Sequence, residues 1–340
     1  MHAESTIRWP RLKGSPVLDS VRPVIERSRD VRTNSSKIVE VASWMAYEEL
    51  PIPDYALPFG IGNDESRIDE TIDFILTTAS IDTAFTDFSS HVKFEVEYAG
   101  RVWSDSDALF ACMKRAMDNG IPILDGGFLA QVSRTEMEKL FEGNIELPML
   151  DEKTAILHQV GAQLAQKYDG RFHNFVAACS PRLYDDGKGL VDGLVRDFPR
   201  FKDVSPYDGH DVLLYKLPQL AIWFLYTSLR KSGRFPIADI HTMSAFADYI
   251  VPVAFRLLGI TSYSPDLENA INSFQMIPRD SAWEVEIRAH CIYASALLAE
   301  EINSLRPPDR QIIVPQIDAR LWTHYHTTWW PHHLTKTIMY

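Results

Sequence analysis

The feature that most restricts the fold of this chain is a succession of amphipathic segments with helical spacing, most of which end at a glycine or a proline. After Ser35 or Ser36, either of which can cap a helix, apolar residues recur near helical period until Pro51 ends the pattern. Similar patterns predict helices over 105–119, 151–168, 190–198, 218–232, 252–258, 267–274 and 280–305. The chain is therefore predicted to be mainly α-helical.

A β-structure is expected in one place. Residues 92–104 alternate between polar and apolar side chains on both sides of Ala99-Gly100, which is typical of a hairpin with a tight turn. No fixed-period repeat or flexible linker divides the chain. We therefore expect a single globular domain over residues 1–340, mainly α with a small β-hairpin near 92–104.

Charge and apolar content exclude several classes of protein. The 340 residues carry a formal net charge of −12, which disfavours a nucleic-acid or anionic-membrane surface. The N-terminal stretch lacks the apolar segment of a signal peptide, and the longest apolar run, near 220–226, is far shorter than the ~20 residues of a membrane span. Cys112, Cys179 and Cys291 are widely spaced, which favours reduced thiols. We expect a cytoplasmic protein.

Common cofactor motifs are missing from the sequence. It contains no GxGxxG, GxxxxGK[ST] or HExxH pattern, so nothing indicates a dinucleotide, a nucleoside triphosphate or a metalloprotease zinc. Four histidines, at positions 324, 326, 332 and 333, lie among C-terminal aromatic residues, but their spacing does not suit a metal site. We expect this segment to pack on the protein body with its imidazoles hydrogen-bonded, and we expect no metal and no cofactor.

Asp248 and Lys216 are the most informative candidates for catalysis. Asp248 lies in FADYIVP between Phe246 and Tyr249, and Pro252 suits a first helical position. A carboxylate near a helix start is favoured as an ion by the helix dipole, but a helix-capping role explains it equally well. Lys216 precedes an apolar helix, where a solvated lysine is the ordinary alternative.

The segment WEVEIRAH, residues 283–290, offers further candidates. Glu284 and Glu286 could accept hydrogen bonds from the N1–H and 2-amino edge of a guanine-like base, and Trp283 could stack on it. The alternative is that both glutamates are exposed helix residues. Glu284 and Arg288 are spaced i,i+4, so they could also form a surface ion pair.

Taken together, several short strings resemble the queuosine salvage protein family, and they extend in order over nearly the whole chain. They are GIPI (120–123), FPRFKDV (198–204), LYK (214–216) with Gln219-Leu220, TMSAFADYIVP (242–252), WEVEIRAH (283–290) and PHHLTKTIMY (331–340). The resemblance implies a mainly helical relative of the helix-hairpin-helix DNA glycosylases that hydrolyses queuosine 5′-monophosphate to queuine and ribose 5-phosphate. It also implies that Asp248 is the catalytic aspartate and Lys216 the family's lysine.

Two departures from the family pattern concern the predicted site. Pro218 stands where a small or basic residue is expected. Where the family tends to read like LDALNFSFW, this chain has TASIDTAFTDF, which keeps Asp82 and Phe85 in line for substrate binding but loses a tryptophan.

The chemistry of N-glycoside cleavage suits these residues. Breaking a ribosyl C1′–N bond passes through an oxocarbenium-like transition state, which an ionised Asp248 can stabilise or attack. Phe246, Tyr249 or Trp283 can stack on the flat base. The cations expected to bind the phosphate are Lys216, Arg320, His332, His333 and Lys336. We expect a monomer with a small-molecule substrate; the alternatives are a silent helical module that binds nucleotides or nucleic acid, and a purely structural protein.

Overall fold

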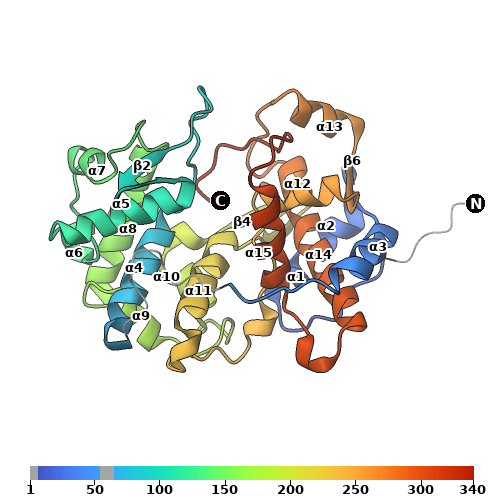
Figure 1. Ribbon diagram of the computed structural model, residues 1–340, viewed down its shortest axis with the longest axis horizontal. Helices are drawn as coiled ribbons and strands as arrows, with labels where there is room; N and C mark the ends of the chain where they lie inside the picture. The colour runs from blue at the N-terminus through green and yellow to red at the C-terminus, as the bar shows by residue number, and fades with distance from the viewer. Residues whose placement is uncertain (1–6, 54–64) are drawn as a thin grey trace, which may run out of the picture. The chain divides into compact units, whose positions relative to one another are not determined.

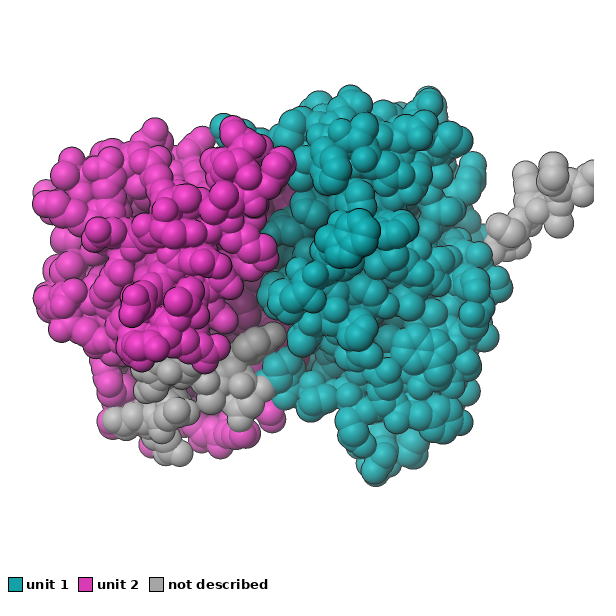
Figure 2. Space-filling model, turned by 45° about the horizontal axis from the view of Figure 1, so that its top comes forward, with its two compact units in different colours: residues 1–53, 203–216, 239–336 teal, residues 54–202, 217–238, 337–340 magenta. Residues whose placement is uncertain are grey.

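In the computed structural model, residues 7–53 and 65–340 are described, and they divide into two compact units, each built from several chain segments (Figures 1 and 2). Unit 1 contains residues up to 53, 203–216 and 239–336, and unit 2 contains 54–202, 217–238 and 337–340. The mainly helical architecture with small two-stranded sheets confirms the predicted fold class. The single-domain organisation and the likeness to helix-hairpin-helix glycosylases stay predictions. Residues 1–6 of the N-terminal stretch, in which no signal peptide is expected, lie outside the described residues.

Unit 1 is organised around one long helix, α14, which spans Ala282–Leu305 and is buried along most of its length. The other helices and strands of this unit are α1 (Pro16–Ser20), α2 (Arg22–Arg27), β1 (Val31–Thr33), α3 (Ser35–Met45), β4 (Val204–Tyr207), β5 (His210–Leu213), α12 (Ile250–Leu257), β6 (Thr261–Tyr263), α13 (Pro265–Asn272) and α15 (Val314–Tyr325). Helices α2, α3, α12 and α15 pack against α14 (Figure 1). Its polar residues between Glu284 and Ser295 therefore lie inside the unit.

Unit 2 holds the predicted hairpin and a second group of helices. Its elements are α4 (Ile68–Ser80), β2 (Glu95–Tyr98), β3 (Arg101–Ser104), α5 (Asp105–Asp118), α6 (Gly126–Leu129), α7 (Arg134–Leu140), α8 (Leu150–Lys167), α9 (Phe172–Ala178), α10 (Leu190–Asp197) and α11 (Lys216–Leu229), which begins at the last residue of a unit 1 segment. Strands β2 and β3 pair antiparallel, with Tyr98 opposite Arg101. This confirms the hairpin.

Three predicted helix starts are wrong. The cap of α3 is Asn34, whose side chain accepts the N–H groups of Ser36 and Lys37. Helix α12 begins at Ile250, so Pro252 is its third residue; this is still within the first turn, where a missing N–H costs nothing. Lys216 is the first residue of α11 and does not precede it.

Other elements escaped prediction because they are short or because their pattern is weak. Strand β1 pairs with β6, and β4 pairs with β5, but each strand has only three or four residues, too few to show alternation.

The C-terminal segment packs on the protein body only in part. His332 is half-buried and His333 is buried, whereas Trp329 is 92% exposed. None of the described helices combines the length and the apolar character of a membrane-crossing segment.

Candidate active site

The proposed catalytic aspartate lies in unit 1 at the start of α12, and its two oxygens have different surroundings. Oδ1 of Asp248 accepts the N–H of Ile250 at 2.7 Å and that of Val251 at 3.3 Å. Among the described residues, no donor bonds to Oδ2. Asp248 is only 7% exposed. The capping alternative is therefore correct for one oxygen, and it leaves the other available for chemistry.

Burial sets the electrostatics of Asp248. Desolvation raises the pKa of its carboxyl above the usual range, and the charge of Lys216, the two capping N–H groups and Arg288 oppose this rise. We expected the helix start to keep this carboxylate ionised; the structure adds a larger, opposite effect of burial. A buried cation is needed to favour the ion.

Lys216 is such a cation, and it is buried rather than solvated, with 8% of its surface exposed. Asp203 fixes its backbone, because Oδ2 of Asp203 accepts the N–H of Lys216 at 3.2 Å and the carbonyl of Asp203 accepts those of Leu214 and Tyr215. Tyr215 itself has a φ of 41°, a left-handed conformation that is uncommon for an aromatic residue. The hydrogen bonds with Asp203 therefore hold Tyr215 in this uncommon conformation.

Arg288 connects the segments that carry Lys216 and Asp248. Its Nε donates to the carbonyl of Ala247 at 2.8 Å, and its guanidinium forms a two-pronged pair with Asp203 at 3.1 and 2.6 Å. It also pairs with Glu284 at 3.1 Å. Arg288 and Glu284 are both completely buried. The surface ion pair that we considered for Glu284 and Arg288 is therefore wrong; the pair is internal and holds the site together.

Both glutamates of WEVEIRAH are already hydrogen-bonded within the chain. Besides Arg288, Glu284 accepts the N–H of Asp280 at 3.2 Å. Glu286 accepts three backbone N–H groups, those of residues 29–31, and the hydroxyl of Tyr207 at 2.7 Å. The alternative that they are exposed is wrong, since neither exceeds 1% exposure. Base recognition by either glutamate stays a prediction.

The aromatic candidates are placed differently from one another. Tyr249 stacks on the ring of His332 at a centroid distance of 4.5 Å. Phe246 is buried, and its N–H donates to Oδ2 of Asp318 at 2.8 Å. Trp283 packs instead on a hydrophobic cluster formed by Val31, Leu267, Ile271, Ile277 and Ile287. Tyr249 and Phe246 thus lie in the segment that carries Asp248, whereas Trp283 packs on this hydrophobic cluster.

The predicted phosphate cations are mostly engaged or uncharged. Burial lowers the pKa of His332 and of His333, so neither imidazole is favoured as a cation. His332 Nδ1 donates to the carbonyl of His333 at 2.8 Å, which leaves Nε2 of the neutral ring as an acceptor. Arg320 is paired with Glu48 at 2.8 Å, and Lys336 is exposed.

Asp82 and Phe85 belong to unit 2. Asp82 is buried and accepts the hydroxyl of Ser106 at 2.8 Å. The ring of Phe85 lies 5.6 Å from the ammonium of Lys153, which donates to the carbonyls of Ala84 and Pro148. Their substrate-binding role stays a prediction.

Asp203 and Asp318 are polar members of this cluster that the sequence reasoning missed. Asp203 is in the FPRFKDV string, but an aspartate in a motif gives no sign of its partner 85 residues away. Asp318 lies beside Ile317 on α15, close to the apolar positions of a helix that we did not predict. The signal that could have identified Asp318 is a carboxylate among the apolar positions of a helix. In residues 7–53 and 65–340, no three metal-ligating side chains are arranged to hold an ion.

The site thus contains a buried carboxylate with one oxygen that accepts no hydrogen bond from the described residues, a buried lysine and aromatic neighbours, on a mainly helical scaffold. A family model for the queuosine salvage protein matches residues 63–340, and the chain belongs to this family. It is 30% identical over 328 residues to the queuosine 5′-phosphate N-glycosylase/hydrolase of Sphaerobacter thermophilus, covering 95% of this chain and 97% of that protein. The similarly named proteins of Schizosaccharomyces pombe and Bos taurus are 28% and 25% identical, over 91% and 90% of this chain and 90% of each relative.

Proposed function

We propose that this protein hydrolyses the N-glycosidic bond of queuosine 5′-monophosphate, releasing queuine for tRNA modification and ribose 5-phosphate. The observation that carries the proposal is the carboxylate of Asp248, which is anchored through Oδ1, accepts no hydrogen bond at Oδ2 from residues 7–53 and 65–340, and feels the charge of Lys216. Such a carboxylate can stabilise the ribosyl cation or capture it. The relatives' names supply the substrate.

In this proposal the remaining residues bind and orient the nucleotide. Lys216 contacts the phosphate or the ribose. Tyr249 and Phe246 offer flat surfaces for the base, and Nε2 of His332 accepts a hydrogen bond rather than supplying positive charge. The free thiols of all three cysteines support a reducing, cytoplasmic location. We expect a monomer, which sedimentation velocity can test.

A hydrolysis assay tests the reaction itself. Purified protein with queuosine 5′-monophosphate should release queuine, detected by chromatography, at a rate that EDTA leaves unchanged. GMP is the control substrate and should be turned over far more slowly. Loss of activity on chelation, or equal turnover of GMP, contradicts the proposal. Binding without any product favours the alternative, a nucleotide-binding module.

Replacement of Lys216 by Met tests its role, since Met keeps an apolar stem and removes the charge. The loss of kcat/KM should be larger for the 5′-phosphate than for the free nucleoside. Equal losses on both substrates would place Lys216 on the ribose or give it a structural role.

A further inference from the structure

A second carboxyl group, that of Asp318 on α15, accompanies Asp248 in the same buried cluster. Asp318 is 4% exposed, and its Oδ2 accepts the N–H of Phe246 at 2.8 Å. The carbonyl of Phe246 in turn accepts the N–H of Asp248 at 2.7 Å. Helices α12 and α15 pack against each other. The short segment 246–251 therefore holds both carboxyl groups, each through a single oxygen.

The remaining oxygen of each group is unbonded within the described part of the chain. For Asp248 this is Oδ2, and for Asp318 it is Oδ1. Asp248 and Asp318 keep 7% and 4% of their surface exposed.

The charges of the cluster do not balance. Four buried carboxyl groups, those of Asp203, Glu284, Asp248 and Asp318, are accompanied by two buried cations, Arg288 and Lys216. Arg288 is committed to Asp203 and Glu284. Lys216 is then the cation left for both Asp248 and Asp318. Two carboxyl groups in one apolar site that share one cation do not both ionise readily, so one of them keeps its proton.

Asp318 is the better holder of that proton. Asp248 has two N–H donors and the charges of Lys216 and Arg288, whereas Asp318 has a single N–H donor and the charge of Lys216. Burial, and next the charge of Asp248, raises the pKa of Asp318 well above its usual range, against the N–H of Phe246 and the charge of Lys216. Burial also disfavours the charged forms of His332 and His333, so neither supplies a further cation, and it keeps the neighbouring thiol of Cys291 neutral.

We propose that Asp318 is the general acid of the reaction, giving its proton to the departing base while Asp248 stays ionised. This inference rests on the proposed function. The C1′–N bond breaks with its electron pair moving to the base nitrogen, and the base receives the proton of Asp318. Water then adds to C1′, directly or after capture by Asp248, and one of its protons restores Asp318. Two carboxyl groups with separated pKa values are the general arrangement for glycoside cleavage.

The test uses the dependence on the leaving group. Asp318→Asn keeps an acceptor for the N–H of Phe246 but carries no transferable proton. On queuosine 5′-monophosphate its kcat should fall by about 10²-fold or more, a typical effect of removing a general acid. On 4-nitrophenyl β-ribofuranoside 5-phosphate, whose leaving group departs without a proton, kcat should fall by less than about fivefold. Asp248→Asn should lose activity on both substrates.

Controls separate this role from a structural one. Asp73→Asn is matched, because Asp73 of unit 2 is also buried, accepts a backbone N–H at 2.8 Å and has a pKa raised by burial. It should leave both rates unchanged. Asp318→Glu should recover part of the lost activity. The alkaline limb of the wild-type rate profile, where Asp318 loses its proton, should be absent in Asp318→Asn.

Two results overturn the inference. One is an equal loss by Asp318→Asn on both substrates, and the other is retention of more than a tenth of kcat on the nucleotide. The pH–rate profile of Asp318→Glu serves if the wild type does not cleave the aryl riboside or if Asp318→Asn does not fold. An alkaline limb that lies at the same pH in the wild type and in Asp318→Glu then contradicts the inference. Failure of the wild type to release queuine is a separate result and contradicts the proposed function.

Discussion

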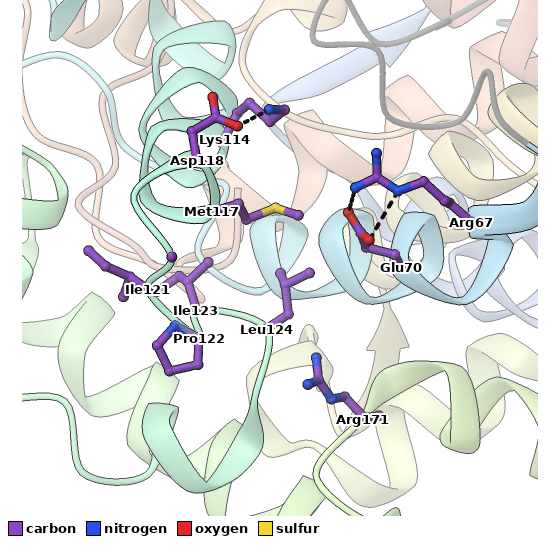
Figure 3. A pocket seen from close by; sticks show the side chains of 11 residues that line it. Arg67, Glu70, Lys114, Met117, Asp118, Ile121, Pro122, Ile123, Leu124 and Arg171 are labelled. Carbon is purple, nitrogen blue, oxygen red and sulfur yellow. Dashed lines mark hydrogen bonds and ion pairs between the residues drawn. The ribbon is translucent and has the colours of Figure 1, made fainter.

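The cluster around Asp248 in unit 1 and the pocket of Figure 3 in unit 2 are both rich in charge, but they hold it in opposite ways. The pocket is open and has a volume of about 380 Å³ beside the GIPI string, and its cations are paired with carboxylates: Arg67 with Glu70, and Lys114 with Asp118. Arg171 lies 3.7 Å from Asp73. In the cluster around Asp248, by contrast, the charges are buried and the carboxyl groups outnumber the cations.

This difference bears on which of the two regions is the better candidate for the catalytic site. Exposed pairs near a pocket are screened by water and cost little to form or to break. Buried charges without full compensation are costly, so they persist where they have a use. The open volume in unit 2 is therefore weaker evidence for catalysis than the unbalanced cluster in unit 1.

The largest effect should follow the loss of the charge of Asp248. Asp248→Asn keeps an acceptor for the N–H groups of Ile250 and Val251, so the protein should fold and still bind substrate. Its single-turnover rate should fall by about 10²- to 10³-fold or more, because the missing interaction is strongest in the transition state. Melting temperature, queuine affinity and single-turnover rate measured together test this. An Asp248→Asn variant that retains a tenth of the wild-type rate would contradict the catalytic role of Asp248.

Removal of Arg288 should give the largest loss of stability. Arg288→Met leaves Asp203 and Glu284 buried without their partner, and breaking a buried pair in this way costs about 3–5 kcal/mol. Arg134→Met is the matched change in unit 2, where the arginine pairs with Glu138, Glu146 and Asp151 at the surface. Denaturant unfolding should show a small fraction of the Arg288 effect there. Equal losses would remove the contrast between the two regions.

The loss of stability at low pH should also originate in unit 1, at the buried side chain of His290. The ring nitrogens of His290 lie 2.7 Å from Thr33 Oγ1 and 2.9 Å from Ser28 Oγ. Burial lowers the pKa of His290 to about 3 from its ordinary value of 6.5. As the pH falls from about 6.5 toward 3, His290 therefore becomes protonated in the unfolded chain but not in the folded protein. The free energy of unfolding then decreases by up to about 1.4 kcal/mol per pH unit. Above pH 6.5 this contribution is constant.

His290→Gln isolates that contribution, because glutamine can keep a hydrogen bond but does not titrate. The variant should be less stable at neutral pH, and its free energy of unfolding should change less steeply than that of the wild type between pH 6.5 and 4. Urea unfolding at several pH values provides the comparison. Parallel curves for the two proteins would show that His290 is not the titrating group.

The smallest effect should come from the pocket of unit 2. Lys114→Met removes one cation from its lining and breaks the pair with Asp118. We expect kcat and KM for queuosine 5′-monophosphate to stay within about twofold of the wild type, since an exposed pair contributes little. A marked rise in KM would move substrate binding to unit 2.

Sequence reasoning predicted several of the longer helices and named Asp248 and Lys216 as candidates, but it did not predict the network of hydrogen bonds and ion pairs around them. The periodicity that predicts α14 follows from its apolar positions, and it is confirmed from Ala282 to Leu305. The alternative that Glu284 and Glu286 are exposed is wrong: Glu284 is buried with Arg288 on the same helix, and residues 29–31 and Tyr207, distant in sequence, bind Glu286. Asp203 and Arg288 are 85 residues apart, and no local pattern encodes such a pair. The local spacing of residues predicts helices and strands, whereas tertiary contacts determine which charged side chains are buried.

The position of bound substrate tests the account most directly. A crystal structure of the Asp248→Asn variant with queuosine 5′-monophosphate should place C1′ of the ribose against the side chain at position 248. The phosphate should lie near Lys216, and the departing nitrogen within reach of Asp318. A nucleotide found instead in the pocket beside residues 120–124 of unit 2, with the cluster around position 248 unoccupied, would contradict it.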